Sequence, residues 1–279
     1  MANSARFEPD REHADRLVTP GQLGEVLRAV RQQAPLVHCL TNVVAAHWTA
    51  NVLMAVGAAP AMVDNRHEAG GFAATADAVL VNLGTPYDET STSMRIAAVA
   101  GRAADRPWVL DPVAAGGLPW RTDLAAELLG HSPTVVRGNA SEILGLVGGG
   151  GGHGVDATHR PEAVLPSARG LASEHQTVVA ISGVVDHITD GRRLVRVHNG
   201  HPWLTRVTGA GCSLGALIAA FTASGKDPLL AATAATAAFT VAAESAAAST
   251  RGPGSFAVAL LDELHGLTAE QVVERARLS

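Results

Sequence analysis

The segment from Thr208 to Cys212, with the sequence TGAGC, runs directly into an apolar stretch and has the residue types of an anion-binding turn. Its three central residues, Gly209, Ala210 and Gly211, leave the backbone free to adopt conformations that larger side chains hinder. A helix that begins at once would point its first N–H groups out of its N-terminus, where they bind phosphate without a basic side chain. Cys212 falls in the first helical turn, and we expect the helix dipole to lower the pKa of its thiol. This turn is therefore predicted to be a catalytic site.

Polar residues also end several expected strands, at the sheet edge where α/β proteins bind their ligands. Asp111 closes one strand, and its carboxylate could hold hydrated Mg²⁺ or cap the following turn. Asn139 and Glu142 could form a capping box, or could organise Mg²⁺ and its waters while Arg137 binds phosphate oxygens. Ser182 ends another strand as a small polar residue suited to a nucleotide phosphate or base.

Other motifs in the sequence allow fewer functional interpretations. Asn42 follows a strand and could cap the next helix or hydrogen-bond a substrate, while His38 within that strand is expected to pack in the core. The histidines show no HExxH motif, so no metal cluster of that kind is expected. The stretch 211–215 matches GxSxG, the nucleophile elbow of α/β-hydrolases, but only His265 follows it as a possible triad histidine. No GK[ST] sequence occurs, which excludes a lysine-bearing phosphate loop.

The elements that must position these residues are strands alternating with helices, which predict a mainly parallel sheet flanked by helices on both faces. Asp190-Gly191 predicts a hairpin, and only helices are expected from Cys212 onward. We expect one α/β domain over 19–279, a flexible extension over 1–18 and a flexible surface loop at the glycine run 148–152. The expected strands are 36–40, 59–62, 78–82, 108–111, 134–137, 177–181, 187–189 and 193–198. The expected helices before the turn are 23–32, 44–56, 89–104, 123–129, 140–146 and 164–174.

Composition limits the classes of partner. Nearly half of the 279 residues are hydrophobic, enough for a sizeable core, and the net charge is −5. With no basic excess and one lysine, Lys226, the chain is not expected to bind nucleic acid. A phosphate group must instead be bound by arginines, backbone amides and a metal ion. The two cysteines, Cys39 and Cys212, lack a disulfide framework, so we expect free thiols in a reducing cytoplasm.

No segment is expected to enter a membrane. The longest apolar run, residues 229–248, is mostly alanine and threonine with Glu244 inside, which favours a buried or subunit-facing helix. Residues 1–20 are charged and lack the apolar core of a signal peptide.

Together these motifs resemble the hydroxyethylthiazole kinase family, a branch of the ribokinase-like fold. The resemblance runs from about Pro35 to the C-terminus, through the segments 35–42, 57–62, 81–85, 110–113, 137–142, 181–186, 198–201, 207–212 and 252–256. It implies a ribokinase-like fold and phosphorylation of 4-methyl-5-(2-hydroxyethyl)thiazole on its hydroxyl, with ATP and Mg²⁺, for thiamine biosynthesis. It also implies a homotrimer with the thiazole site at a subunit boundary.

Each site residue takes its expected role from this resemblance, by its position in the matching segments. The expected thiazole contacts are Asn42, Val44, Met62 and Gly209. The expected ATP contacts are Arg137, Ser182, Asn139 and Thr208, and the metal and phosphate region is Asp111 and Glu142. The turn from Gly209 to Cys212 forms the anion hole. Cys212 stands at the catalytic position, where related ribokinase-like enzymes usually have an aspartate as general base.

Departures from the family pattern are the charged extension, the glycine run and the segment 114–116, where Ala-Ala-Gly replaces the frequent Gly-Ala-Gly. Two other functions fit the same residues: a kinase of another small heteroaromatic alcohol, and a nucleotide-binding module without turnover. Val43, Val44 and Met62 form an apolar slot that favours a flat heteroaromatic ring over a sugar. The intact Asp111 and Glu142 argue against a module that has lost turnover.

Overall fold

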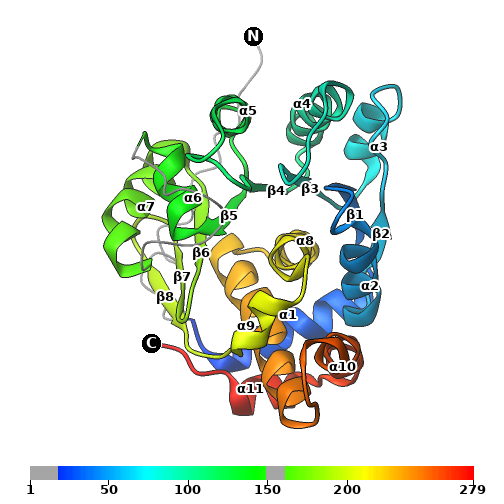
Figure 1. The fold of residues 1–279 in the computed structure, drawn as a ribbon, viewed down its shortest axis with the longest axis vertical. Helices are drawn as coiled ribbons and strands as arrows, with labels where there is room; N and C mark the ends of the chain where they lie inside the picture. Colours follow the sequence, from blue (N-terminus) through cyan, green and yellow to red (C-terminus); the bar gives the residue numbers. More distant parts are fainter. Residues whose placement is uncertain (1–17, 149–160) are drawn as a thin grey trace.

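The computed structural model describes residues 18–148 and 161–279, so almost all of the expected N-terminal extension and glycine run lie outside the described residues. Within these residues, eight strands form one sheet in the order β2-β1-β3-β4-β5-β6-β7-β8 (Figure 1). Strands β1 to β6 are parallel, and β7 and β8 add an antiparallel hairpin. The strands are β1 (Leu36–Leu40), β2 (Ala59–Ala61), β3 (Ala78–Asn82), β4 (Trp108–Asp111), β5 (Val135–Asn139), β6 (Val178–Ser182), β7 (Asp186–Thr189) and β8 (Leu194–Val197).

The parallel strands are short and almost continuously apolar because helices cover both faces of the sheet. In β3, for example, all five residues are buried. The predicted mainly parallel sheet and the hairpin at Asp190-Gly191 are confirmed. Strands β5 and β6 extend further than predicted, and their last paired residues are Asn139 and Ser182. Two expected ATP contacts therefore lie side by side at the carboxyl edge of the sheet.

Two helical layers pack on the sheet, with α3 to α7 on one face and α1, α2 and α8 to α11 on the other (Figure 1). Each layer encloses its own apolar core, and the sheet separates the two cores. The helices are α1 (Pro20–Gln33), α2 (Ala46–Val56), α3 (Ala69–Thr75), α4 (Asp88–Ala103), α5 (Pro119–Leu129), α6 (Ala140–Leu146), α7 (Pro161–His175), α8 (Ala210–Ser224), α9 (Pro228–Ala248), α10 (Pro253–Gly266) and α11 (Ala269–Arg275), with a 3₁₀ helix η2 (Pro202–Arg206) before α8.

The long helix α9 is buried on nearly all sides, in contact with α1, α8 and α10. Its small alanines allow these helices to approach closely. The hydroxyls of Thr233, Thr236 and Thr240 donate to carbonyls four residues earlier over 2.7–2.8 Å, so they are buried without an unpaired donor. Among the described residues, α9 alone is long and apolar enough to cross a membrane, and 83% of its apolar window is buried. It is a core helix, as expected.

Two further features differ from the sequence prediction. The helix α3 was not predicted, because its sequence AGGFAAT contains two glycines that weaken the helical pattern. The expectation of helices alone after Cys212 is wrong at Leu278, which forms a single antiparallel bridge with Val197 in β8. The C-terminal segment thus closes the outer edge of the hairpin.

Candidate active site

The turn before α8 has the backbone expected of an anion-binding turn. Gly209 is the N-cap residue of α8, with φ 84° and ψ −3°, a left-handed conformation that favours glycine. A Cβ at this position would also lie 3.1 Å from the Cβ of Ala45 and 3.2 Å from Cδ1 of Trp48. Cys212 is the third residue of the helix, so its thiol lies in the first turn, as predicted.

Arg137 in β5 reaches the same helical turn. Its Nη2 donates to Ser182 Oγ over 2.8 Å, and its Nη1 lies 3.5 Å from Asp111 Oδ2. A Cβ on Gly211 would lie 3.0 Å from Arg137 Nη1, so this glycine lets the guanidinium approach α8. A cation therefore meets the positive end of a helix dipole, an arrangement that attracts anions. Asp111 supplies one negative charge when it is ionised, and a phosphate would supply another.

A series of hydrogen bonds joins the thiol of Cys212 to Asp111. Asn42 Nδ2 lies 3.4 Å from Cys212 Sγ and donates to Asn82 Oδ1 over 2.8 Å. Asn82 Nδ2 in turn donates to Asp111 Oδ2 over 2.8 Å. These residues end β3 and β4 or follow β1, and the carboxyl ends of parallel strands share one edge of the sheet. Residues far apart in the sequence are thus brought into one polar cluster.

Burial governs ionisation in this cluster. Desolvation raises the pKa of the Asp111 carboxyl to about 7, although the charge of Arg137 opposes the rise. Burial also raises the pKa of the Cys212 thiol, and the charge of Asp111 adds to this effect against the hydrogen bond from Asn42. The predicted lowering of the Cys212 pKa is therefore wrong, because burial disfavours the charged form of the thiol.

One oxygen of Asp111 suits a cation. The residue is fully buried, and its Oδ1 has no hydrogen-bond partner among the described residues. A buried carboxylate oxygen without a partner fits a bound cation or an ordered water. Within 18–148 and 161–279 no three His, Cys, Asp or Glu side chains converge. A Mg²⁺ ion here would take its other oxygens from water and phosphate, as this ion usually does.

The Glu142 carboxylate accepts hydrogen bonds from two separate backbone segments. Its Oε2 accepts from the N–H of Asn139 over 2.8 Å, and Asn139 Oδ1 accepts from the N–H of Glu142 over 3.0 Å, so the predicted capping box is present. Its Oε1 accepts from the N–H of Ala114 over 3.1 Å. Ala114 has φ 65°, a left-handed conformation that favours glycine. Glu142 therefore holds in place the strained turn that follows Asp111.

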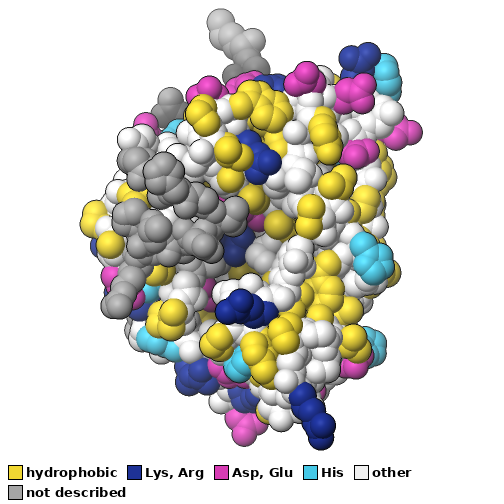
Figure 2. All heavy atoms as spheres, viewed as in Figure 1, with side chains coloured by type: hydrophobic (Ala, Val, Ile, Leu, Met, Phe, Trp, Pro, Cys, Tyr) yellow, Lys and Arg dark blue, Asp and Glu magenta, His cyan; other side chains and the backbone are white. Residues whose placement is uncertain are grey.

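The expected thiazole contacts differ in their surroundings. Val44 and Met62 follow β1 and β2 and are 60% and 38% exposed. Figure 2 shows apolar side chains along the right-hand side of this face, over α2 and α3. Asn42 is buried, and its Oδ1 accepts from the N–H of Ala45 over 3.0 Å. Asn42 thus holds the turn before α2 but is not the N-cap itself. Thr208 is exposed in the turn before α8.

Comparison with known proteins places the chain in a family. The hydroxyethylthiazole kinase family matches residues 27–270. A hydroxyethylthiazole kinase from Clavibacter sepedonicus is 58% identical over 256 residues, covering 91% of this chain and 93% of that relative. The chain belongs to the hydroxyethylthiazole kinase family. A further kinase of this name, from Leptospira interrogans, is 48% identical over 92% of this chain and 97% of its own length.

Solved structures agree with this assignment. The hydroxyethylthiazole kinase protein of Pyrococcus horikoshii OT3 superposes with a TM-score of 0.86 at 39% identity, covering 92% of this chain and 98% of that one. A pyridoxal kinase from Staphylococcus aureus, in complex with AMP-PCP and pyridoxal, has a TM-score of 0.55 at 19% identity, over 75% of this chain and 87% of that one. The predicted ribokinase-like fold is thereby confirmed.

Two residues of the cluster had no role in the sequence prediction. Asn82 ends a predicted strand beside that of Asp111, so the strand-end argument could have found it. Asp186, at the start of β7, accepts from the N–H of Gly183 over 2.9 Å and is almost fully buried. Desolvation raises its pKa to about 7, and the Gly183 hydrogen bond and the charge of Arg137 oppose this. A carboxylate at the start of a short hairpin strand gives no such signal in the sequence.

Replacing Asp186 by asparagine is expected to stabilise the protein more at about pH 8 than at about pH 5. The pKa of this carboxyl is raised to about 7 in the folded chain, against about 4 when unfolded. Its contribution to stability is therefore complete below the unfolded pKa and is lost as the pH rises through the folded one. Asparagine keeps the acceptor for Gly183. Thermal melts should show a gain larger at the higher pH by at least about 2–4 °C; equal differences at both pH values would contradict this.

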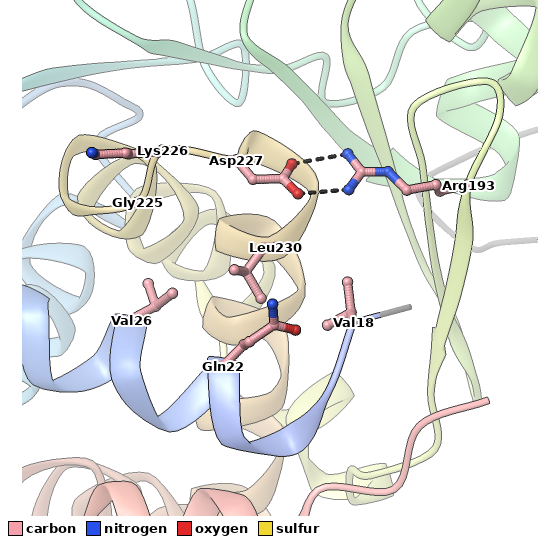
Figure 3. A pocket seen from close by; sticks show the side chains of 8 residues that line it. All are labelled: Val18, Gln22, Val26, Arg193, Gly225, Lys226, Asp227 and Leu230. Carbon is pink, nitrogen blue, oxygen red and sulfur yellow. Dashed lines mark hydrogen bonds and ion pairs between the residues drawn. The ribbon is translucent and has the colours of Figure 1, made fainter. Parts of the chain in front are cut away.

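A cavity of about 160 Å³ lies at the other end of α8 (Figure 3). It adjoins Gly225, the C-cap of α8, and so lies roughly 20 Å along the helix from Cys212. Arg193 and Asp227 in its wall form two bonds of 2.6 and 3.0 Å, which neutralise both charges. The cavity is thus separate from the polar cluster.

Proposed function

We propose that the chain transfers the γ-phosphoryl group of ATP to the hydroxyl of 4-methyl-5-(2-hydroxyethyl)thiazole, which gives the thiazole phosphate for thiamine biosynthesis. The observation that carries this proposal is the position of the Arg137 guanidinium against Gly211, in the same helical turn as Cys212. Phosphoryl transfer depends mainly on positioning and on neutralising charge. A cation and a helix N-terminus at the carboxyl edge of a parallel sheet supply both.

The phosphate would be held by backbone and side-chain donors together. The N–H of Ala210 already donates to the Val207 carbonyl over 3.2 Å, which leaves Gly211 and Cys212 as the amide donors of the first turn. Arg137 supplies the guanidinium, with its orientation fixed by Ser182. We infer that Asn139 and Thr208, at the edge of this region, contact ATP further from the transferred group.

Asp111 and Glu142 would hold Mg²⁺. When bound, the ion neutralises charge on the β- and γ-phosphates of ATP. Asp111 contributes its unpartnered Oδ1, while Asn82 fixes the other oxygen. Glu142 contributes through the remaining lone pairs of its carboxylate and through the turn at Ala114, whose N–H it accepts.

Cys212 is inferred to lie beside the acceptor hydroxyl and to receive its proton. Because burial raises the pKa of the thiol, only its small thiolate fraction can accept this proton at neutral pH. A small fraction suffices because the transition state of phosphoryl transfer is loose and the hydroxyl loses its proton late.

The thiazole ring would lie on the apolar side of the site, against Val44 and Met62, close to Asn42 and Gly209. Both apolar side chains are partly exposed in the single chain. We infer that a neighbouring subunit of a homotrimer covers them and completes the pocket. The free thiols of Cys39 and Cys212 support a reducing, cytoplasmic setting.

ADP release by the purified chain tests the substrate class. The assay contains ATP and Mg²⁺ with one alcohol at a time: the thiazole alcohol, a hydroxymethylpyrimidine, pyridoxal or ribose. We expect the thiazole alcohol to give the highest kcat/KM. A higher value with another ring would reassign the substrate, and the absence of turnover with every alcohol would indicate a nucleotide-binding module.

The variant Glu142→Gln is expected to raise the Mg²⁺ concentration that gives half-maximal activity by about tenfold, because a charged oxygen ligand becomes neutral. The amide oxygen of glutamine can still accept one of the two backbone N–H groups, so the capping box is only partly lost. A Mg²⁺ titration at saturating ATP measures the change. An unchanged titration would show that Glu142 caps the helix and does not bind Mg²⁺.

A further inference from the structure

The orientation of the Asn82 side chain is fixed by a backbone group. Its Oδ1 accepts from the N–H of Gly84 over 3.0 Å, and a peptide N–H can only donate. The oxygen must therefore face Gly84, and Nδ2 must face Asp111 Oδ2 at 2.8 Å. Asn82 is fully buried at the end of β3, so it orients other side chains and does not meet solvent.

The Asn42 side chain is fixed in the same way. Its Oδ1 accepts from the N–H of Ala45 over 3.0 Å, so its Nδ2 must point in the other direction. This Nδ2 donates to Asn82 Oδ1 over 2.8 Å and lies 3.4 Å from Cys212 Sγ. Two peptide N–H groups thus set the direction of every bond in the series, and the sulfur receives a hydrogen rather than giving one.

A third feature protects this arrangement. A Cβ added to Gly84 would lie 2.7 Å from the Cβ of Asn42 and still closer to the side-chain amide of Asn42. The two groups would overlap. Gly84 does not belong to the glycines with a positive φ. The close approach of Asn42, and not the backbone conformation, therefore requires a glycine at this position. The Asn42 amide can lie between Asn82 and Cys212 only because position 84 has no side chain.

We propose that Asn82 is a positioning residue for the reaction, which fixes the Asn42 amide so that one of its N–H groups is directed at the sulfur of Cys212. The proposal deepens the proposed kinase function and rests on it for the consequence in turnover. A donor directed at sulfur favours the thiolate over the thiol and holds the side chain in one rotamer. Gly84 serves the same purpose by leaving room for the amide.

Alkylation of the substrate-free protein by iodoacetamide tests the positioning without any turnover. Cys212 should be the thiol that reacts, because Cys39 is buried and burial raises its pKa to about 12. Asn82→Ala removes the acceptor for Asn42, and Gly84→Ala displaces Asn42 while all polar groups remain. Each should slow alkylation of Cys212 about three- to tenfold at constant pH, because the sulfur loses its donor.

The matched control is Gly170→Ala in α7, where an added Cβ meets nothing within 4 Å. It should react at the wild-type rate. In steady-state kinetics, Asn82→Ala should lower kcat about tenfold or more, because the Asn42 amide is no longer held against Cys212.

The proposal is overturned if Cys212 reacts within about twofold of the wild-type rate in folded Gly84→Ala, a variant that tests the point even where Asn82→Ala does not fold. It is also overturned if the two variants change the thiazole KM and leave kcat unchanged. If alkylation slows as expected while the wild-type chain phosphorylates no thiazole alcohol, the positioning stands and the proposed function fails.

Discussion

Replacement of Arg137 by alanine is expected to lower kcat/KM for ATP about a thousandfold, the effect of removing an arginine that stabilises a phosphoryl group in transfer. The guanidinium is nearly buried and contacts Ser182 and Asp111. It also fills the space that a Cβ on Gly211 would occupy. No other cation is within hydrogen-bond distance of Asp111 among the described residues. The fold should survive, because the pKa of Asp111 is already raised to about 7 and the carboxyl can take up a proton when its partner is lost.

Steady-state kinetics with varied ATP measure this loss. Arg137→Lys should recover only part of it, because an ammonium is a point charge without the planar fork of donors that binds a phosphate bidentately. The matched control is Arg95→Ala, which breaks a similar pair with Glu127 on the exposed faces of α4 and α5. That variant should retain wild-type kinetics. If kcat/KM for ATP in Arg137→Ala stays within about tenfold of the wild-type value, the arginine does not act at the reaction centre.

A series at Cys212 is expected to follow how readily each side chain can accept the proton of the acceptor hydroxyl. Cys212→Ala should lower kcat about a hundredfold, the lower range for loss of a general base. Cys212→Ser should fall between alanine and wild type, since a hydroxyl still accepts a hydrogen bond. Cys212→Asp should equal or exceed wild type, because a carboxylate beside Arg137 is ionised more fully than a thiol whose pKa burial has raised.

Saturating kcat values and the thiazole KM should be measured for all three variants, together with nucleotide binding as a test of intact structure. Near-native kcat in the alanine and serine variants, with no gain from aspartate, would show that Cys212 accepts no proton. A large rise in thiazole KM with constant kcat would instead make the side chain a binding contact.

Strand positions were predictable because buried parallel strands are short apolar runs bounded by polar residues. β1, β3 and β4 match their predicted bounds, and the hairpin follows from Asp190-Gly191. The ends of β5 and β6 were less well predicted, since Gly138-Asn139 and Ser182 have the types of loop residues and pair only because the neighbouring strand is there. The helix α3 is held by tertiary contacts with α4 and not by its own propensity.

The site shows what a sequence conveys and what it does not. Asp111, Arg137, Ser182 and Cys212 were predictable from strand ends and from one glycine-rich turn, and the structure brings them together. The ionisation of Cys212 was predicted in the wrong direction, because a helix dipole can be inferred from sequence whereas the burial of one side chain cannot.

Hydrogen-bond direction is equally invisible in a sequence. The link through Asn82 depends on which way two amides face, and this is set by the peptide N–H groups of Gly84 and Ala45. The strain at Ala114 likewise appears only with the backbone angle, although the departure from glycine at this position was visible.

The central claim is that Arg137, Cys212 and the turn before α8 transfer phosphate from ATP to an alcohol and not to water. Its most direct test measures ADP and phosphorylated alcohol together, with and without the thiazole alcohol, at saturating ATP and Mg²⁺. We predict one thiazole phosphate for each ADP formed, and almost no ADP when the alcohol is left out. ADP formed at the same rate without the alcohol, or with no phosphorylated product, would contradict the account.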